Sequence, residues 1–173
     1  MLSKATEKAI NEQIVNELYS SNAYLSVASY MDSEGLKVLS AFFFRQSAEE
    51  RDHALKLLHY MLDVGGKVLI GTVPAPMATF KSVEHAVQES LNQEKTVTEQ
   101  INRLMGLAHK ESDYATASFL KWFVDEQVEE LSTMHELLLL VQKAGDQNLL
   151  LVEDRLLKQG VTLSRAHLPG ESE

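Results

Sequence analysis

The sequence has no cysteine and only 3 prolines and 8 glycines among its 173 residues. The lack of cysteine excludes disulfide bonds, thiolate zinc sites and iron–sulfur clusters. The scarcity of proline and glycine favours long helices, because both residues interrupt them. Basic residues are also few, with 16 Lys and Arg against 25 Asp and Glu. The resulting formal charge of −9 argues against a general nucleic-acid binder and is compatible with cationic ligands.

Long hydrophobic runs are missing as well. The longest aliphatic run covers residues 137–141, whereas a transmembrane helix needs about 20 apolar residues. The N-terminal segment carries Glu7, Glu12 and Glu17 and lacks the apolar stretch of a signal peptide. We therefore expect a soluble, cytoplasmic protein that contacts neither membranes nor nucleic acid. Its length fits one domain, which we place at residues 1–165, followed by a tail of residues 166–173.

Helical periodicity predicts an all-α protein with five helices. Four long helices cover approximately residues 4–32, 37–64, 83–110 and 114–144, with Ser3, Ser82 and Asp113 as N-caps. A short fifth helix opens at Asp146 and ends at Gly160. The first and second long helices are joined by only a few residues, as are the third and fourth, so each pair forms an antiparallel hairpin. The connection between the hairpins, about 17 residues, can extend about 55 Å and cross the whole bundle. We predict a four-helix bundle with one long crossover.

Each long helix has an inward apolar stripe with 3, 4 spacing, and polar residues interrupt every stripe near its middle. Mid-helix positions meet at one height whichever way the helices run, so we expect one buried polar layer. Its members are Glu17 on the first helix, Glu50 and His53 on the second, Glu94 on the third, and Gln127 and Glu130 on the fourth.

An internal repeat supports this layer. A constant offset of 77 residues relates two sets of positions, as expected for two halves around a pseudo-twofold axis. The pairs are Glu17 with Glu94, Glu49 with Glu126, Glu50 with Gln127, and His53 with Glu130.

A layer of buried glutamates needs cations, because isolated buried carboxylates are costly and repel one another. An ion-paired structural role would require an inward Lys or Arg, and the stripes contain none. Histidine with carboxylates suits a first-row transition metal, and a twofold set of carboxylates suits two ions. We interpret the layer as a dinuclear iron site. Tyr24 fits either core packing or a redox role, whereas Trp122 fits packing. We assign the remaining histidines to the surface or to packing: His59, His85, His109, His135 and His167.

The single Glu17, the Glu50-x-x-His53 motif, the single Glu94 and the Gln127-x-x-Glu130 motif resemble the ferritin family, specifically its bacterial non-haem members. The resemblance covers residues 1 to about 165. It implies a cage of 24 subunits that oxidises ferrous iron with dioxygen or hydrogen peroxide and stores the ferric product as a hydrated oxide mineral. The fifth helix would then pack against symmetry copies near a fourfold axis, since we expect the closed bundle to leave it no core of its own.

The resemblance also implies roles for individual residues. The ferroxidase ligands would be the members of the polar layer, with Gln127 beside them, and Tyr24 would be an electron donor. A third iron would use Glu49, Glu126, Glu129 and the shared Glu130. Arg51 stands where bacterioferritins carry their haem-ligating methionine, so we expect no haem. The second motif also departs from the Glu-x-x-His that di-iron bundles usually carry twice, which suits iron that moves on to a mineral.

Three alternatives remain. The first is a di-iron oxidase or peroxidase that stores nothing. The second is a miniferritin that coats DNA, which the lack of a basic tail and the site within one subunit disfavour. The third is a metal-free helical interaction module, which the buried glutamate layer disfavours. The fold pattern alone does not choose among these functions.

Overall fold

The structure of the chain is a computed structural model that describes residues 2–160. Within this range the chain forms five α-helices, one short 3₁₀-helix and no strand, which confirms the all-α prediction. None of these helices combines the length and the apolar character needed to cross a membrane. Their bounds are Lys4–Ser33 for α1, Lys37–Asp63 for α2, Val83–Lys110 for α3, Tyr114–Ala144 for α4, Asp146–Asn148 for the 3₁₀-helix η1, and Leu149–Lys158 for α5.

All three predicted N-caps form through side chains. Ser3 Oγ accepts a hydrogen bond from the backbone N–H of Thr6 at 3.1 Å, and Ser82 Oγ accepts one from His85 at 3.0 Å. Asp113 Oδ1 does the same in the first turn of α4, at 3.1 Å. Each cap satisfies one of the N–H groups that a helix start leaves unpaired, which is worth about 1 kcal/mol. The residue before α2 makes no such side-chain cap.

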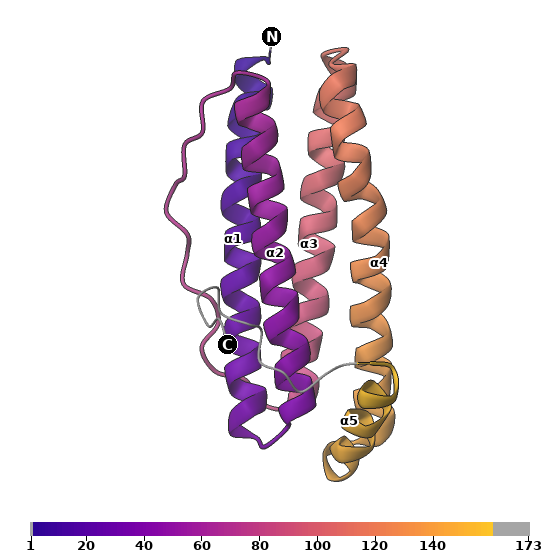
Figure 1. The fold of residues 1–173 in the computed structure, drawn as a ribbon. Helices are drawn as coiled ribbons and strands as arrows, with labels where there is room; N and C mark the ends of the chain where they lie inside the picture. Colours follow the sequence, from indigo (N-terminus) through magenta and orange to yellow (C-terminus); the bar gives the residue numbers. More distant parts are fainter. Residues whose placement is uncertain (1, 161–173) are drawn as a thin grey trace, which may run out of the picture.

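The helices α1 to α4 lie side by side as a bundle, and residues 64–82 run along α1 from one end to the other (Figure 1). This crossover lets α2 and α3 run parallel, as predicted. Asn11 fixes its start, because Nδ2 donates to the carbonyl of Lys67 at 2.8 Å and Oδ1 accepts from the N–H of Leu69 at 2.7 Å. Further along, Ser26 Oγ donates to the carbonyl of Met77 at 2.5 Å. The long connection is therefore held against α1 by polar contacts with its backbone.

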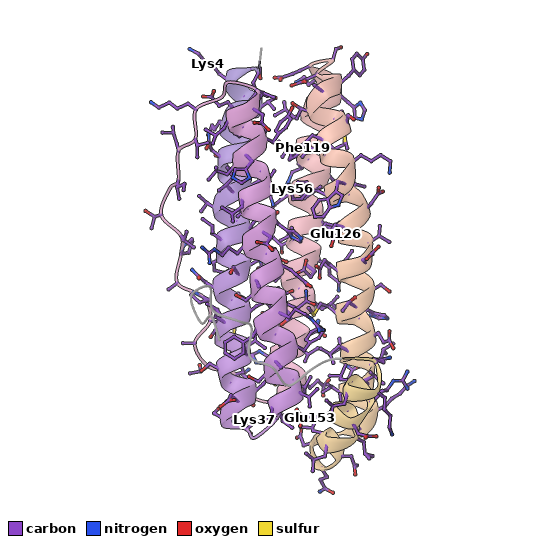
Figure 2. The ribbon with its side chains drawn as sticks, in the orientation of Figure 1. Lys4, Lys37, Lys56, Phe119, Glu126 and Glu153 are labelled. Atoms are coloured by element: carbon purple, nitrogen blue, oxygen red, sulfur yellow. The ribbon has the colours of Figure 1, made fainter. Side chains whose placement is uncertain are left out.

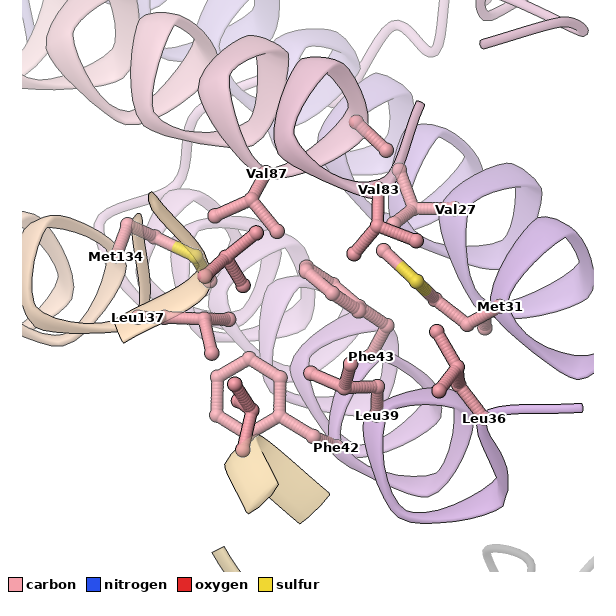
Figure 3. Close-up of a cluster of buried hydrophobic side chains, with 14 of the residues drawn as sticks. Val27, Met31, Leu36, Leu39, Phe42, Phe43, Val83, Val87, Met134 and Leu137 are labelled. Carbon is pink, nitrogen blue, oxygen red and sulfur yellow. The ribbon is translucent and has the colours of Figure 1, made fainter. Parts of the chain in front are cut away.

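The interior contains two apolar clusters. One includes Ile14, Leu57 and Ile101, and the other includes Phe43 and Val87. Side chains from all four long helices meet in the second cluster (Figure 3). On each long helix the predicted polar residues lie between the segments that feed the two clusters. The polar layer is thus enclosed by apolar packing above and below.

Residues 146–158 correct two expectations about the fifth helix. Residues Asp146–Asn148 form a 3₁₀ turn, so α5 begins at Leu149 rather than next to Asp146. The helix also fills part of this chain's own core, because Val152 and Leu156 are buried in the cluster around Phe43. Its opposite face remains exposed and carries Leu150, Leu151 and Leu157.

Glu153 joins α5 to the start of α2. Its Oε1 accepts hydrogen bonds from the backbone N–H groups of Val38 at 2.7 Å and Leu39 at 3.0 Å. Figure 2 shows Glu153 beside Lys37, at the end of the bundle where α2 begins. The cap that α2 lacks locally is therefore supplied from the far end of the sequence.

Candidate metal centre

The structure brings the six residues of the predicted polar layer together in the bundle interior. All six are buried, with 0–5% of their surface exposed. One face of each long helix delivers them, because the 3, 4 spacing keeps their side chains on the inward stripe. They are Glu17 from α1, Glu50 and His53 from α2, Glu94 from α3, and Gln127 and Glu130 from α4.

Three overlapping groups of ligand atoms lie in and beside this layer. Within each group, one ligand atom from each of three residues lies within 4.8 Å of the other two. Glu50, His53 and Glu130 each belong to two groups. The groups are Glu17 with Glu50 and His53, Glu50 with Glu94 and Glu130, and His53 with Glu126 and Glu130. Adjacent cation positions can therefore share Glu50 or Glu130, whose carboxylates have two oxygens, whereas a neutral His53 has one free ring nitrogen and can serve only one position at a time.

Glu50 is the least satisfied residue of the layer. No amide, hydroxyl or backbone N–H group among the described residues donates to its two buried carboxylate oxygens or to Oε2 of Glu17. The carboxyl group of Glu17, when protonated, is the one neighbour placed to donate to Glu50. The nearest cationic candidate is Nδ1 of His53, which lies 3.5 Å from Glu50 Oε2. A buried carboxylate without a partner destabilises the fold by several kcal/mol, unless the carboxyl group stays protonated and neutral. These oxygens are oriented for ligands that the polypeptide itself does not supply.

Burial and mutual repulsion raise the pKa values of the layer. Desolvation, followed by the neighbouring carboxylates, raises the pKa values of Glu17 and Glu50 well above their ordinary range. Desolvation also raises the pKa of Glu94 to about 7, although the hydrogen bond from Tyr24 lowers it. Desolvation together with the charge of Glu94 raises the pKa of Glu130 to about 8. Without metal the layer retains protons at neutral pH, and a bound cation would displace them.

Glu94, unlike Glu50, accepts hydrogen bonds from a phenol and an amide donor. Tyr24 Oη donates to Glu94 Oε1, and Gln127 Nε2 donates to Glu94 Oε2 at 3.1 Å. Burial, followed by the charge of Glu94, raises the pKa of Tyr24 well above its usual value, which keeps the phenol proton in place. Gln127 therefore contributes a donor to Glu94 in this arrangement.

Two buried glutamines extend the set of donors. Gln13 Nε2 donates to Glu17 Oε1 at 2.9 Å, and Gln46 Nε2 donates to Glu130 Oε2 at 3.2 Å. Neither glutamine was among the predicted site residues. The available signal was their spacing, because each lies one helical turn before a glutamate of the layer, Glu17 or Glu50.

The three outer carboxylates, Glu49, Glu126 and Glu129, differ in exposure and in their distance from the polar layer. Glu126, midway along the bundle on α4 (Figure 2), is half-buried and joins His53 and Glu130 in a ligand group. Glu49 is exposed, and its Oε2 accepts a hydrogen bond from Gln46 Nε2 at 2.8 Å. Glu129 is exposed and belongs to none of the ligand groups formed by residues 2–160. The geometry thus brings Glu126 to the layer and leaves Glu129 outside it.

Trp122 covers His53 on the flank between α2 and α4. The two rings meet edge-on with centroids 5.4 Å apart, and Lys56 Nζ lies 4.2 Å from the Trp122 ring centroid. Of the remaining histidines, His59, His85, His109 and His135 take part in none of the three ligand groups. His167 lies outside the described residues.

Comparisons with known proteins agree with this geometry. A family model described as a ferritin-like domain matches residues 7–144. The bacterial non-heme ferritin of Staphylococcus epidermidis is 40% identical over 146 residues, covering 84% of this chain and 88% of the relative. That of Staphylococcus aureus is 38% identical over 148 residues, covering 86% and 89%.

Solved structures give the same result. A humanized archaeal ferritin matches with a TM-score of 0.89 and 34% identity, covering 94% of this chain and 99% of the other. An open-pore ferritin from Archaeoglobus fulgidus matches with a TM-score of 0.87 and 36% identity, covering 90% and 96%. With a matching family model, relatives over most of its length and the same bundle, the chain belongs to the ferritin family.

Proposed function

We propose that this protein is an iron-storage ferritin that oxidises Fe(II) at the polar layer and stores the Fe(III) product as a hydrated oxide mineral inside a 24-subunit cage. The observation that carries the proposal is Glu50, whose two buried oxygens accept no hydrogen bond from an amide, a hydroxyl or a backbone N–H within residues 2–160 and which is shared by two ligand groups. Such a carboxylate is suited to bridge two cations.

In this proposal iron is the substrate, and two ions bind side by side. One uses Glu17, Glu50 and His53, and the other uses Glu50, Glu94 and Glu130. Carboxylates with one imidazole suit iron better than magnesium or calcium. Two ferrous ions release two electrons, which reduce dioxygen to hydrogen peroxide with the uptake of two protons, or hydrogen peroxide to water. In the metal-free protein Glu94 and Glu130 hold protons near neutral pH, and binding of the two ions would release these protons.

The two iron positions are not equivalent. Gln127 stands where a twofold copy of Glu50 would lie, and its Nε2 donates to Glu94. Glu130 stands where a copy of His53 would lie, so the second position has carboxylate ligands only and no imidazole. This asymmetry supports release of the oxidised iron toward a mineral.

A third iron is proposed beside the pair, at Glu126 and Glu130 of the ligand group that these residues form next to His53. Glu49 lies next to this group through its contact with Gln46. The role of Glu129 stays a prediction from the resemblance. The absence of haem and the redox role of Tyr24 are likewise predictions.

The main alternative is a di-iron oxidase or peroxidase that keeps its metals and stores nothing. Aerobic ferrous loading followed by iron analysis separates the two functions when combined with the mass of the native particle. Tens of iron atoms per subunit in a particle near 24 subunits are expected for storage. Two iron atoms per subunit, or a particle of one or two subunits, would contradict the storage proposal.

A further inference from the structure

Gln46 is the one donor that links the buried layer to the outer carboxylates in the described part of the chain. Its side chain is 4% exposed and lies on α2. Its Nε2 donates to Glu130 Oε2 at 3.2 Å inside the bundle and to Glu49 Oε2 at 2.8 Å at the flank. A carboxamide nitrogen carries two hydrogens, so it can serve both oxygens at once.

The two carboxylates that Gln46 joins repel each other. Both bind the same amide nitrogen, so their carboxylates lie close together and repel each other when both are ionised. Glu49 is exposed and could turn into water, which would free its side-chain rotamers and relieve the repulsion. The hydrogen bond from Gln46 opposes this movement and keeps the carboxylate of Glu49 at the edge of the layer.

We infer that Gln46 is a positioning residue that holds the Glu49 carboxylate beside Glu130, so that a divalent cation bound beside the pair by Glu126 and Glu130 gains Glu49 as a further ligand. This inference rests on the proposed function. Of the inner pair's carboxylates, Gln46 contacts only Glu130. The pair depends less on Gln46 than the third ion does, because Glu17 and Glu94 have their own donors in Gln13, Gln127 and Tyr24.

Gln13 provides a matched control on the opposite side of the layer. It is also buried, at 3% exposed, and its Nε2 donates to Glu17. Its other side-chain partners are Asn16 and Gln100, neither of which is a carboxylate. Gln13→Met and Gln46→Met therefore remove the same chemical group, at similar volume, from different carboxylates.

The experiment is calorimetric titration of the metal-free protein with Zn²⁺, which is redox-inert. We expect the wild type to bind two ions tightly and a third more weakly. Gln46→Met should lower the affinity for the third ion about 10- to 100-fold, since partners that orient metal ligands typically contribute that much to affinity. The affinities for the first two ions should change much less. Gln13→Met should show the reverse pattern, with the loss in the tight pair.

A second variant protects the test against misfolding. Glu49→Gln changes an exposed residue and should weaken the third ion to a similar extent. The double variant Gln46→Met with Glu49→Gln should then bind the third ion no more weakly than either single variant does. Both substitutions act on the same contribution, the Glu49 carboxylate held by Gln46, so their effects should not add.

Each outcome is decisive. A third ion bound with wild-type affinity by Gln46→Met or by Glu49→Gln would overturn the inference, as would equal weakening of the third ion in Gln13→Met. A wild type that binds the pair and no third ion would also overturn it. A wild type that binds no pair at all would instead contradict the proposed function.

Discussion

The phenol of Tyr24 on α1 donates its hydrogen bond to the carboxylate of Glu94 on α3, 70 residues further along the chain. The pair connects the aromatic residue nearest the layer to a proposed iron ligand. The Tyr24 ring also lies against Phe43, with centroids 5.8 Å apart. Tyr24 therefore belongs both to the apolar core and to the polar layer.

Tyr24→Phe should leave iron binding intact and alter the oxidation kinetics. The ring and its packing persist in this variant, and Gln127 still donates to Glu94. Removing one buried hydrogen bond should cost about 0.5–1.5 kcal/mol of stability in the metal-free protein. Stopped-flow absorbance during ferrous oxidation checks the kinetics. A kinetically silent variant would reduce Tyr24 to a packing residue.

His53→Ala should abolish fast ferrous oxidation while the particle still assembles. His53 is the only imidazole in the ligand groups formed by residues 2–160, so the first iron position loses its nitrogen ligand. Initial oxidation rates should fall more than about 10-fold, because even partners that only orient metal ligands contribute that much to affinity. His59→Ala, which changes a histidine outside these groups, is the matched control. Equal rates in wild type and His53→Ala would contradict the proposed site.

Glu50→Leu should stabilise the metal-free protein by about 1–4 kcal/mol, because it replaces an unpartnered buried carboxylate with apolar volume. Glu94→Leu should do the opposite. That substitution leaves the Tyr24 hydroxyl without its acceptor, at about 1–3 kcal/mol. The Gln127 amide also loses one acceptor but keeps Thr98 Oγ1 at 3.2 Å.

Chemical denaturation at fixed protein concentration checks both variants, since subunit association adds to apparent stability. A Glu50→Leu protein less stable than the wild type would mean that Glu50 is satisfied in solution. The account of the layer as a site built for cations would then fail.

The stability of the metal-free protein should fall as the pH rises through neutrality. Burial raises the pKa of Glu94 from its ordinary value of 4.5 to about 7 and that of Glu130 to about 8. Above pH 4.5 the unfolded state releases protons that the folded state keeps. The protonated carboxyl groups therefore contribute to stability at low pH, and this contribution is lost as the pH rises to about 8.

Unfolding free energies of the metal-free protein between pH 5 and pH 8 measure this slope. Glu50→Leu should flatten it, because one carboxyl group with a raised pKa is gone. A wild-type stability that rises across this range would contradict the raised pKa values.

Glu153→Ala should loosen the junction between α5 and α2. Two backbone N–H groups in the first turn of α2 lose their acceptor, which should cost about 0.5–2 kcal/mol, as for a lost N-cap. Hydrogen exchange at the amides of Val38 and Leu39 should accelerate. Asp154→Ala, which removes only an exposed contact with Lys158, is the control. Unchanged exchange in Glu153→Ala would show that α2 does not depend on this cap.

The sequence by itself determined the helices, their order and the height of the polar layer. These features depend on short-range rules, because the 3, 4 spacing and the capping residues act within a few turns of one helix. The length of the crossover then restricted the bundle to one topology. The inward positions of Glu17, Glu50, His53, Glu94 and Glu130 followed from the same periodicity.

The tertiary structure alone decided which groups touch. Three contacts depend on how the helices rotate against one another. Glu153 binds Val38, Gln46 joins Glu49 to Glu130, and Glu126 rather than Glu129 approaches His53. Periodicity places a residue on a face of its helix, but a hydrogen bond requires its partner within about 3 Å, on another element and in a matching rotamer. Packing of the whole bundle sets that distance, and no local stretch of sequence contains it.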